Sequence, residues 1–225
     1  MMSEVVKLEN VCSAYEVGNV RTLALQDIKL KILAGEFLGI KGASGSGKSS
    51  LLNVIGLLRK PDEGVVSING TNCSSITPGQ ALEVRRQYIS YVFQSFNLIP
   101  ALTVYRNIEL PLIYQGKPKR ERAKLTEKAI ESFDLNAREG HYPMQLSGGQ
   151  QQRVAIARAI VSKPSIILAD EPTGNLDSDN GSVVLDSLAS LNREGTTILM
   201  VTHSMTDISY CSRVVEMNDG HLVEE

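Results

Sequence analysis

One lysine stands in a run of glycines and serines that interrupts apolar sequence, in the segment GIKGASGSGKSSLLNVIGLL. Residues 42–49, here called the phosphate loop, fit the pattern G-x-x-x-x-G-K-[ST]. Glycines allow successive backbone N–H groups to converge on phosphate oxygens, where side chains would block the approach. Lys48 would reach the outer phosphates, and the Ser49 hydroxyl would bind Mg²⁺. The residues predicted to contact nucleotide here are Gly42, Ser44, Gly45, Ser46, Gly47, Lys48, Ser49 and Ser50.

The flanking sequence favours a nucleotide site over an ordinary glycine-rich turn that happens to hold a lysine. EFLGI, before the loop, has the pattern of a buried strand, and KSSLLNVIGLL, after it, that of a helix. Such a helix would point its positive N-terminal end at the bound anion. We therefore expect a nucleoside triphosphate to bind here.

Two acidic residues, Asp170 and Glu171, follow a second apolar run in SIILADEP. Ligands bind outside the C-terminal ends of parallel strands, so this pair would lie at the same sheet edge as the phosphate loop. Asp170 would hold Mg²⁺ directly or through water, and Glu171 could accept a proton from an attacking water. Alone, the pair would only mark a strand entering solvent; together with the phosphate loop it predicts hydrolysis.

A second candidate anion site is LSGGQQQR, residues 146–153. Ser147 can cap a helix that begins at Gly148, and the glycines Gly148 and Gly149 leave backbone N–H groups open to an anion. An ordinary helix start is the alternative. A single nucleotide would hardly need both this anion site and the phosphate loop on one chain.

The remaining pattern predicts the elements that position these residues. VVKLENV and LALQDIKLKIL alternate as half-buried strands do, Val65–Ile68 precedes an Asn-Gly turn, and QYISYVFQ reads as a further strand. SIILAD and TTILMV are continuous apolar runs typical of buried parallel strands. A helix is expected around residues 182–192, stopping at Gly195, and a hairpin at residues 218–220. Helical periods dominate from about residue 95 to 160. Strands and helices that flank a helical stretch indicate an α/β fold with a helical insertion.

Composition narrows the class of protein. The chain has 225 residues, 42% of them hydrophobic, and a formal net charge of −2, so the basic footprint of a nucleic-acid-binding protein is missing. Its three cysteines form no C-x-x-C pair, which favours a reducing compartment. The start lacks signal-peptide character, and no apolar run approaches the roughly 20 residues of a membrane span. We expect a chain that is soluble by itself and binds no nucleic acid.

LSGGQQQR resembles the signature of ATP-binding-cassette (ABC) proteins, and five other motifs of that family occur in the same order over essentially the whole chain. The resemblance implies that Tyr15 stacks on adenine, that Gln94 touches metal and water, and that His203 contacts the γ-phosphate. Ser204 departs from the family, in which an acid commonly follows the histidine. The further nucleotide contacts implied are Tyr15, Ser147, Gly148, Gly149, Gln150 and Asp177; the catalytic residues implied are Glu171, His203 and Gln94; and the metal ligands implied are Ser49, Gln94 and Asp170.

The resemblance also implies an architecture. Residues 1–225 would form one ABC ATPase domain, a phosphate-loop NTPase core with a mixed, mainly parallel sheet and an N-terminal antiparallel β subdomain. Residues 1–94 and 161–225 would form the catalytic core, and residues 95–160 an inserted α-helical subdomain. With ATP and Mg²⁺ bound, two copies would pair head to tail, each signature covering the ATP on the other's phosphate loop. This pairing would explain why one chain carries two candidate anion sites.

Within the family, FQSFNLIPALTVYRNIELPLIYQG and LADEPTGNLDS resemble the group of lipoprotein-releasing and macrolide-export ATPases, with a cell-division relative nearby. That resemblance implies export or mechanical extrusion of a lipoprotein, peptide or drug. Because the chain ends at Glu225, separate transmembrane permease subunits are expected, at the cytoplasmic face of the inner (plasma) membrane. Val92–Tyr105 are the expected walls of the groove that docks the permease.

Several alternatives stay open at this stage. A division-type ATPase that signals across the membrane to cell-wall hydrolases, an importer ATPase, and a soluble ABC ATPase acting on DNA or ribosomes share the same motifs. The last kind usually has a long coiled-coil insertion or two cassettes in tandem, and neither occurs here. The basic segment GKPKRERAKLTEK is either a solvated helical face or a contact with anionic lipid.

Overall fold

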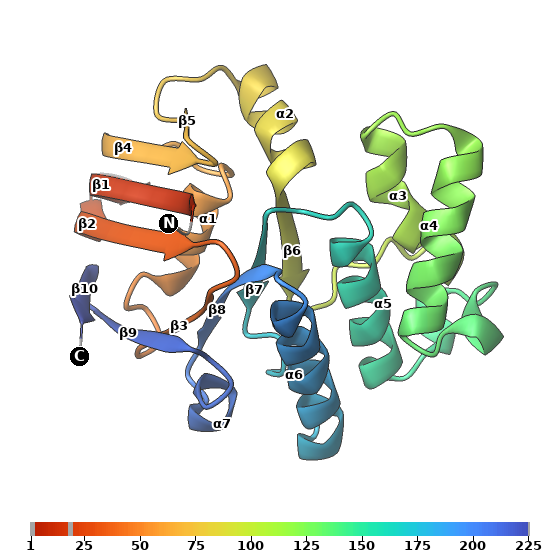
Figure 1. Ribbon diagram of the computed structural model, residues 1–225. Helices are drawn as coiled ribbons and strands as arrows, with labels where there is room; N and C mark the ends of the chain where they lie inside the picture. The colour runs from red at the N-terminus through yellow and green to blue at the C-terminus, as the bar shows by residue number, and fades with distance from the viewer. Residues whose placement is uncertain (1–2, 18–19, 225) are drawn as a thin grey trace.

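The computed structural model describes residues 3–17 and 20–224 and contains two sheets with helices around them (Figure 1). The smaller sheet is antiparallel, in the order β2-β1-β4-β5. Its strands are β1 (Glu4–Val17), β2 (Val20–Leu33), β4 (Glu63–Ile68) and β5 (Thr71–Asn72). The prediction of an N-terminal antiparallel β subdomain is confirmed.

The larger sheet has the order β10-β9-β3-β8-β7-β6, and all its pairs are parallel except the terminal hairpin β9–β10. Its strands are β3 (Phe37–Lys41), β6 (Ile89–Phe93), β7 (Ile166–Asp170), β8 (Thr197–Thr202), β9 (Arg213–Asn218) and β10 (His221–Glu224). The mixed, mainly parallel sheet expected for the core is therefore confirmed. Successive side chains of β3, β7 and β8 enter different cores, as the two-residue period of a strand requires.

One hydrophobic core lies between the two sheets, and helix α1 (Lys48–Ile55) packs in it. The alternate residues Leu168 of β7 and Leu199 of β8 face this core and are fully buried. The other face of the larger sheet, represented by Ile167 and Met200, packs with helices into a second core. Because both faces are covered, these strands read in the sequence as continuous apolar runs.

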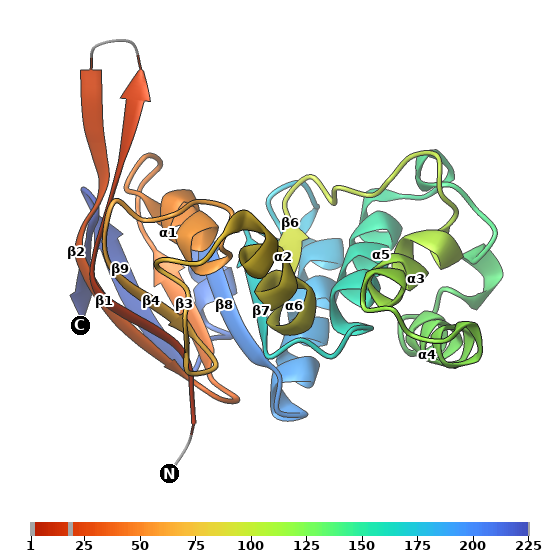
Figure 2. The same cartoon turned by 90° about the horizontal axis from the view of Figure 1, so that it is seen from above.

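The helices of the second core are α3 (Val104–Tyr114), α4 (Lys119–Ser132), α5 (Gly148–Ile160) and α6 (Ser178–Arg193). Short 3₁₀ turns at Asn136–Arg138 and Pro143–Gln145 join α4 to α5, and the short helix α7 (Met205–Ile208) follows β8. Viewed from above, α3, α4 and α5 form a group that projects to one side of the sheets (Figure 2). None of the described helices is both long and apolar enough to cross a bilayer.

Helix α2 (Pro78–Tyr88), strand β6 and helix α1 differ from the elements expected from the sequence. Helix α2 was not predicted, although Thr77 and Gln80 form a capping box and Pro78 occupies the first turn. Because α2 runs to Tyr88, the strand expected from QYISYVFQ is only Ile89–Phe93. Helix α1 ends at Ile55, before the apolar pattern stops, because Gly56 N–H and Leu57 N–H close the last turn on Leu52 and Val54 carbonyls.

Candidate functional site

Four neighbouring parallel strands end in the residues that the motifs single out. The phosphate loop follows β3, His203 follows β8, Asp170 ends β7 immediately before Glu171, and Gln94 follows β6. Since β3, β8, β7 and β6 are adjacent and parallel, their carboxyl ends share one edge of the sheet. The fold therefore brings these sequence-distant residues to a common edge.

Gly42 and Gly47 of the phosphate loop occupy positions where the side chain of any other residue would clash with neighbouring backbone. Gly47 has φ 111°, and a Cβ added there would lie 2.4 Å from the Ala24 carbonyl oxygen. A Cβ added to Gly42 would lie 2.3 Å from the Met217 carbonyl oxygen. Gly45, with φ 81°, has no other atom within 4 Å of that position, so space remains above the loop. These constraints fix the backbone conformation of the turn.

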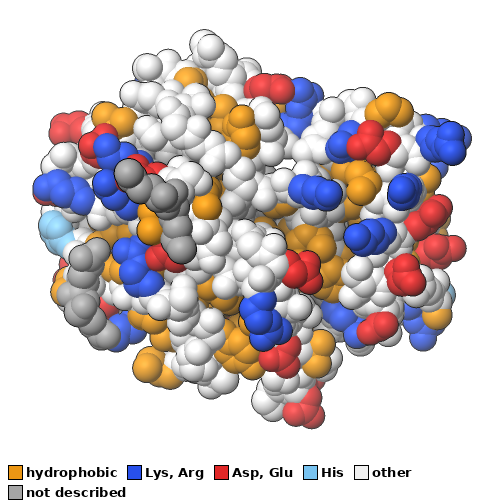
Figure 3. Space-filling model, in the orientation of Figure 1, with side chains coloured by type: hydrophobic (Ala, Val, Ile, Leu, Met, Phe, Trp, Pro, Cys, Tyr) orange, Lys and Arg blue, Asp and Glu red, His pale blue; other side chains and the backbone are white. Residues whose placement is uncertain are grey.

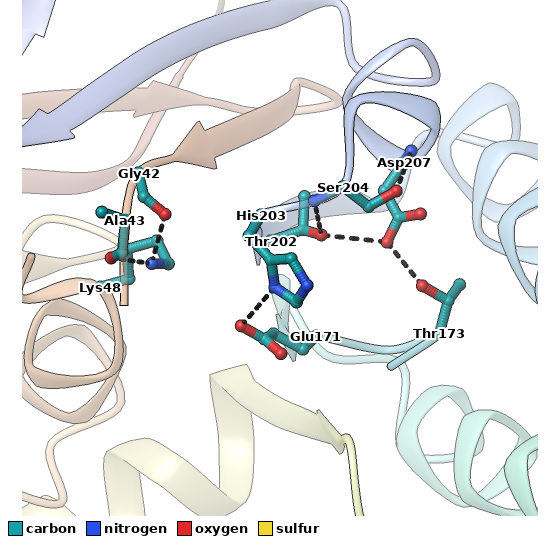
Figure 4. Close-up of polar contacts among 9 residues, drawn as sticks. All are labelled: Gly42, Ala43, Lys48, Glu171, Thr173, Thr202, His203, Ser204 and Asp207. Atoms are coloured by element: carbon teal, nitrogen blue, oxygen red, sulfur yellow. Dashed lines mark hydrogen bonds and ion pairs between the residues drawn. The ribbon is translucent and has the colours of Figure 1, made fainter. Parts of the chain in front are cut away.

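Lys48 is almost fully buried, and its Nζ donates to the carbonyl oxygens of Gly42 and Ala43 at 2.7 Å each (Figure 4). The ammonium group is thus stretched back over the loop. Ser46 Oγ is buried without a hydrogen-bond partner among the described residues, whereas Ser44 and Ser49 are exposed. A cation and an unsatisfied hydroxyl beside exposed hydroxyls suit a loop that receives phosphate oxygens.

Asp170 is the carboxylate that would complete a magnesium site with Ser49. Burial raises the pKa of Asp170, the neighbouring Glu171 raises it further, and the positive charge of Lys48 lowers it. The described residues contain no cluster of three or more His, Cys, Asp and Glu side chains that could hold a metal by themselves. Hydroxyl and carboxylate oxygens beside a phosphate cradle fit Mg²⁺, which binds through one or two carboxylates together with substrate phosphates.

Glu171 and His203 form a direct side-chain pair at the same edge. Glu171 Oε1 lies 3.1 Å from His203 Nδ1, with Glu171 one-quarter exposed and His203 two-thirds exposed (Figure 4). Glu171 has φ 43°, a left-handed conformation that its N–H bond to the Val201 carbonyl helps to fix. The carboxylate therefore faces the end of β8.

Tyr15, the residue implied as an adenine platform, is one-third exposed near the phosphate loop. Ser50 Oγ donates to the Tyr15 hydroxyl at 3.3 Å. The Arg59 guanidinium lies 4.1 Å from the Tyr15 ring centroid, and its Nε donates to Ser13 Oγ. Arg59 thus covers one ring face and leaves only the other for a base. Sequence reasoning missed Arg59, because no local motif places it near Tyr15.

Gln94 contacts the loop that follows the acidic pair, residues 172–177. Asn175 Nδ2 donates to the Gln94 carbonyl at 3.0 Å, and a Cβ added to Gly174 would meet Gln94 Nε2 at 2.6 Å. Arg158 of α5 donates to the Phe96 and Asn97 carbonyls and so braces the segment after Gln94. These bonds hold α5 against the segment that follows β6.

The signature segment starts α5 as expected, with Ser147 as N-cap and Gln150 completing a capping box. It packs on the start of α6: a Cβ on Gly149 would lie 2.2 Å from Asn180 Oδ1. Asn180 in turn donates to Asp177, the N-cap of α6, and its N–H lowers the Asp177 pKa. Within one chain, α1 and α5 lie on opposite sides of β7 (Figures 1 and 2). The two candidate anion cradles are not brought together.

An apolar groove of about 530 Å³ runs between α2 and α3, beside β6. Figure 3 shows hydrophobic side chains next to basic ones at this seam, while charges of both signs are interspersed over the rest of that face. Leu82 and Tyr114 on its walls are more than half exposed. None of the lining residues lies within Val92–Tyr105, the predicted walls; they are Leu82, Arg85, Arg86, Ile89, Ser90, Leu110, Pro111, Tyr114 and Ser162.

Comparison with known proteins gives consistent matches. The family model described as ABC transporter matches residues 25–174, more than half of the chain. An uncharacterized ABC transporter ATP-binding protein of Methanocaldococcus jannaschii is 46% identical over 97% of this chain and 98% of its own length. The macrolide export ATP-binding/permease protein MacB of Escherichia coli is 42% identical over the whole chain, which spans 35% of MacB.

A solved structure shares both the fold and the sequence. It is the dimeric, post-hydrolysis state of the ATP-binding cassette MJ0796 bound to ADP and Pi, with a TM-score of 0.89 and 43% identity over 96% of each chain. The likeness extends across both sheets and the helical part, since so little of either chain is left out.

Proposed function

This chain belongs to the ABC transporter family and is an ATPase, and from that premise we propose that two copies close around two Mg²⁺-bound ATP molecules to drive a separate membrane permease. The observation that carries the proposal is the separation of the phosphate loop from the Ser147–Gly149 segment within one chain. Each segment presents backbone N–H groups to an anion, so each lacks a partner that a second copy would supply. The dimeric state of MJ0796 supports this arrangement.

The chain's own residues then have distinct tasks in hydrolysis. Lys48 would turn from the Gly42 and Ala43 carbonyls to the phosphate oxygens, an exchange of two oxygen acceptors for stronger, charged ones. Glu171 would hold a water through its carboxylate and take up the proton. His203, 3.1 Å from Glu171, would donate a hydrogen bond to the outer phosphate and keep Glu171 in place.

Ser49, Asp170 and Gln94 would hold the magnesium ion, which when bound neutralises charge on the phosphate oxygens. Tyr15 would offer the base its ring face opposite Arg59. Ser147, Gly148, Gly149 and Gln150 would contact the phosphates of the partner's ATP, with Asp177 holding the start of α6 beside them.

We further propose that the α2–α3 groove receives a helix of the permease, at the cytoplasmic face of the membrane. Exposed Leu82 and Tyr114 give it an apolar wall, and Arg85 and Arg86 would favour an acidic residue on the incoming helix. Gln115, which follows α3, donates to carbonyls of Arg86 and Ser162 and so ties this seam together. The similarity to MacB favours export or extrusion as the work performed.

The test of coupling is the ATPase rate of the purified chain with and without the permease encoded next to it. We expect weak turnover alone and a several-fold rise with the permease. Leu82→Lys should abolish the rise while leaving the rate of the isolated chain intact, because the groove lies away from the phosphate loop. Val223→Lys, at a similarly exposed apolar residue on β10, is the matched control. Stimulation that survives Leu82→Lys would refute docking in this groove.

A further inference from the structure

Asp207 is a buried acidic residue that no motif assigns. It lies on α7, four residues after His203, and is only 3% exposed. Its Oδ2 accepts hydrogen bonds from Thr173 Oγ1 at 2.7 Å and from Thr202 Oγ1 at 3.1 Å. A carboxyl oxygen at this depth needs such donors, because an unsatisfied buried acceptor is destabilising.

The surroundings of Asp207 are shielded from water. Burial, together with the smaller effect of the nearby Asp207 carboxyl, raises the pKa of the adjacent Cys211 thiol to about 12. In such a setting hydrogen bonds are strong, and they fix the position of both partners more firmly than exposed ones do. The two threonine hydroxyls are therefore structural anchors.

The two anchors belong to the two loops that carry the Glu171–His203 pair. Thr202 immediately precedes His203, and its Oγ1 also accepts from the Ser204 N–H at 3.0 Å (Figure 4). Thr173 lies two residues after Glu171, on the loop that contacts Gln94 through Gly174 and Asn175 and leads into α6. The Asp207 carboxyl thus bridges the β8 loop to the β7 loop behind the pair.

The Ser204 side chain caps α7, the short helix that carries Asp207. Its Oγ caps α7 by accepting from the Asp207 N–H at 3.3 Å, which orients the first turn of the helix. This chain lacks an acid directly after His203, and the carboxyl enters the same loop from one helical turn further on.

We propose that Asp207 is a positioning residue, which clamps the His203 loop to the Glu171 loop through Thr202 and Thr173 and so sets the distance between the two side chains. This inference rests on the catalytic roles proposed for Glu171 and His203. Because the clamp acts on geometry rather than on nucleotide, loosening it lowers kcat and leaves the KM for ATP unchanged.

The variant Thr173→Val isolates the clamp, since valine keeps the shape of threonine and removes the hydroxyl that anchors this loop to Asp207. We expect kcat to fall about tenfold with KM unchanged. Asp207→Ala should give a similar loss, and the double variant no more than either alone. Thr173→Ser, which restores the hydroxyl, should recover most of the rate. Thr206→Val, at an exposed threonine on α7, is the matched control and should behave as the unmodified chain.

A second measurement separates failure of the clamp from failure of the proposed catalytic roles. In a His203→Ala background, Thr173→Val should lower turnover no further, because the clamp acts through His203. Wild-type kcat in Thr173→Val, while His203→Ala alone has strongly reduced but measurable turnover, would overturn the clamp and leave the catalytic proposal intact. Full activity of His203→Ala would instead refute the role of His203. Equal loss of kcat in Thr173→Ser and Thr173→Val would also overturn the clamp.

Discussion

Glu171 Oε1 and His203 Nδ1 lie 3.1 Å apart although the two residues are separated by 32 positions in the chain. They meet because β7 and β8 are adjacent parallel strands in register, with Asp170 opposite Val201. A water held by Glu171 would therefore lie next to a phosphate group held by His203.

Glu171→Gln should lower turnover by at least about 100-fold while ATP binding is retained, because the amide keeps the size of the carboxylate and loses its basicity. The fall in kcat with unchanged KM is measured by steady-state phosphate release. Glu131→Gln, at an exposed residue of α4, is the control. A Glu171→Gln chain that turns over ATP at the normal rate would contradict the assignment of Glu171 as base.

Lys48→Ala should weaken ATP binding by at least tenfold. Lys48 is the buried cation of the phosphate loop, and its loss removes a charged hydrogen bond to phosphate, worth roughly 1.5–3 kcal/mol. Titration with a fluorescent ATP analogue measures the change. Lys41→Ala, which removes a lysine just before the loop, should leave affinity nearly unaltered; equal effects of the two changes would argue against a specific role for Lys48.

Gly149→Ala should abolish most turnover, since the added methyl would lie 2.2 Å from Asn180 Oδ1 and would push Asn180 away from Asp177. Binding of ATP to the isolated chain should persist, because the phosphate loop lies elsewhere. Gly79→Ala on α2, where only Thr77 Oγ1 at 4.0 Å is near, provides the comparison. Normal turnover in Gly149→Ala would show that the signature surface is not needed.

Arg59→Met should raise the KM for ATP about threefold with kcat unchanged. The guanidinium supports one face of the Tyr15 ring, and an exposed cation–π contact contributes about 0.5–1 kcal/mol. Arg120→Met, at an exposed arginine of α4, controls for the lost charge. If Tyr15→Phe and Tyr15→Ala leave KM equally unchanged, Tyr15 is no adenine platform.

The sequence predicted the motifs and the strands that carry them, because apolar runs such as SIILAD stop where polar residues begin. Parallel pairing then brought the phosphate loop, Asp170, Glu171, His203 and Gln94 to one edge, as the strand order requires. These relationships follow from local pattern and one general rule of α/β sheets.

Contacts between segments without a shared pattern could not be predicted. Arg59 reaches Tyr15 from the loop after α1, and Asp207 joins Thr173 to Thr202 from a helix of only four residues. The α2–α3 groove depends on a helix whose capping box, Thr77 and Gln80, was the one readable signal. Such contacts depend on where the loops lie in three dimensions, which residue type and spacing do not determine.

The central claim is that two copies enclose two nucleotides, and the mass of Glu171→Gln in solution tests it most directly. Sedimentation equilibrium with saturating ATP and Mg²⁺ should give twice the mass of the 24.5 kDa chain, and the same protein without nucleotide should give the single mass. Adding Gly149→Ala should return the nucleotide-bound protein to the single mass. A Glu171→Gln chain that binds ATP fully, yet keeps the single mass both alone and on its permease, would contradict the account.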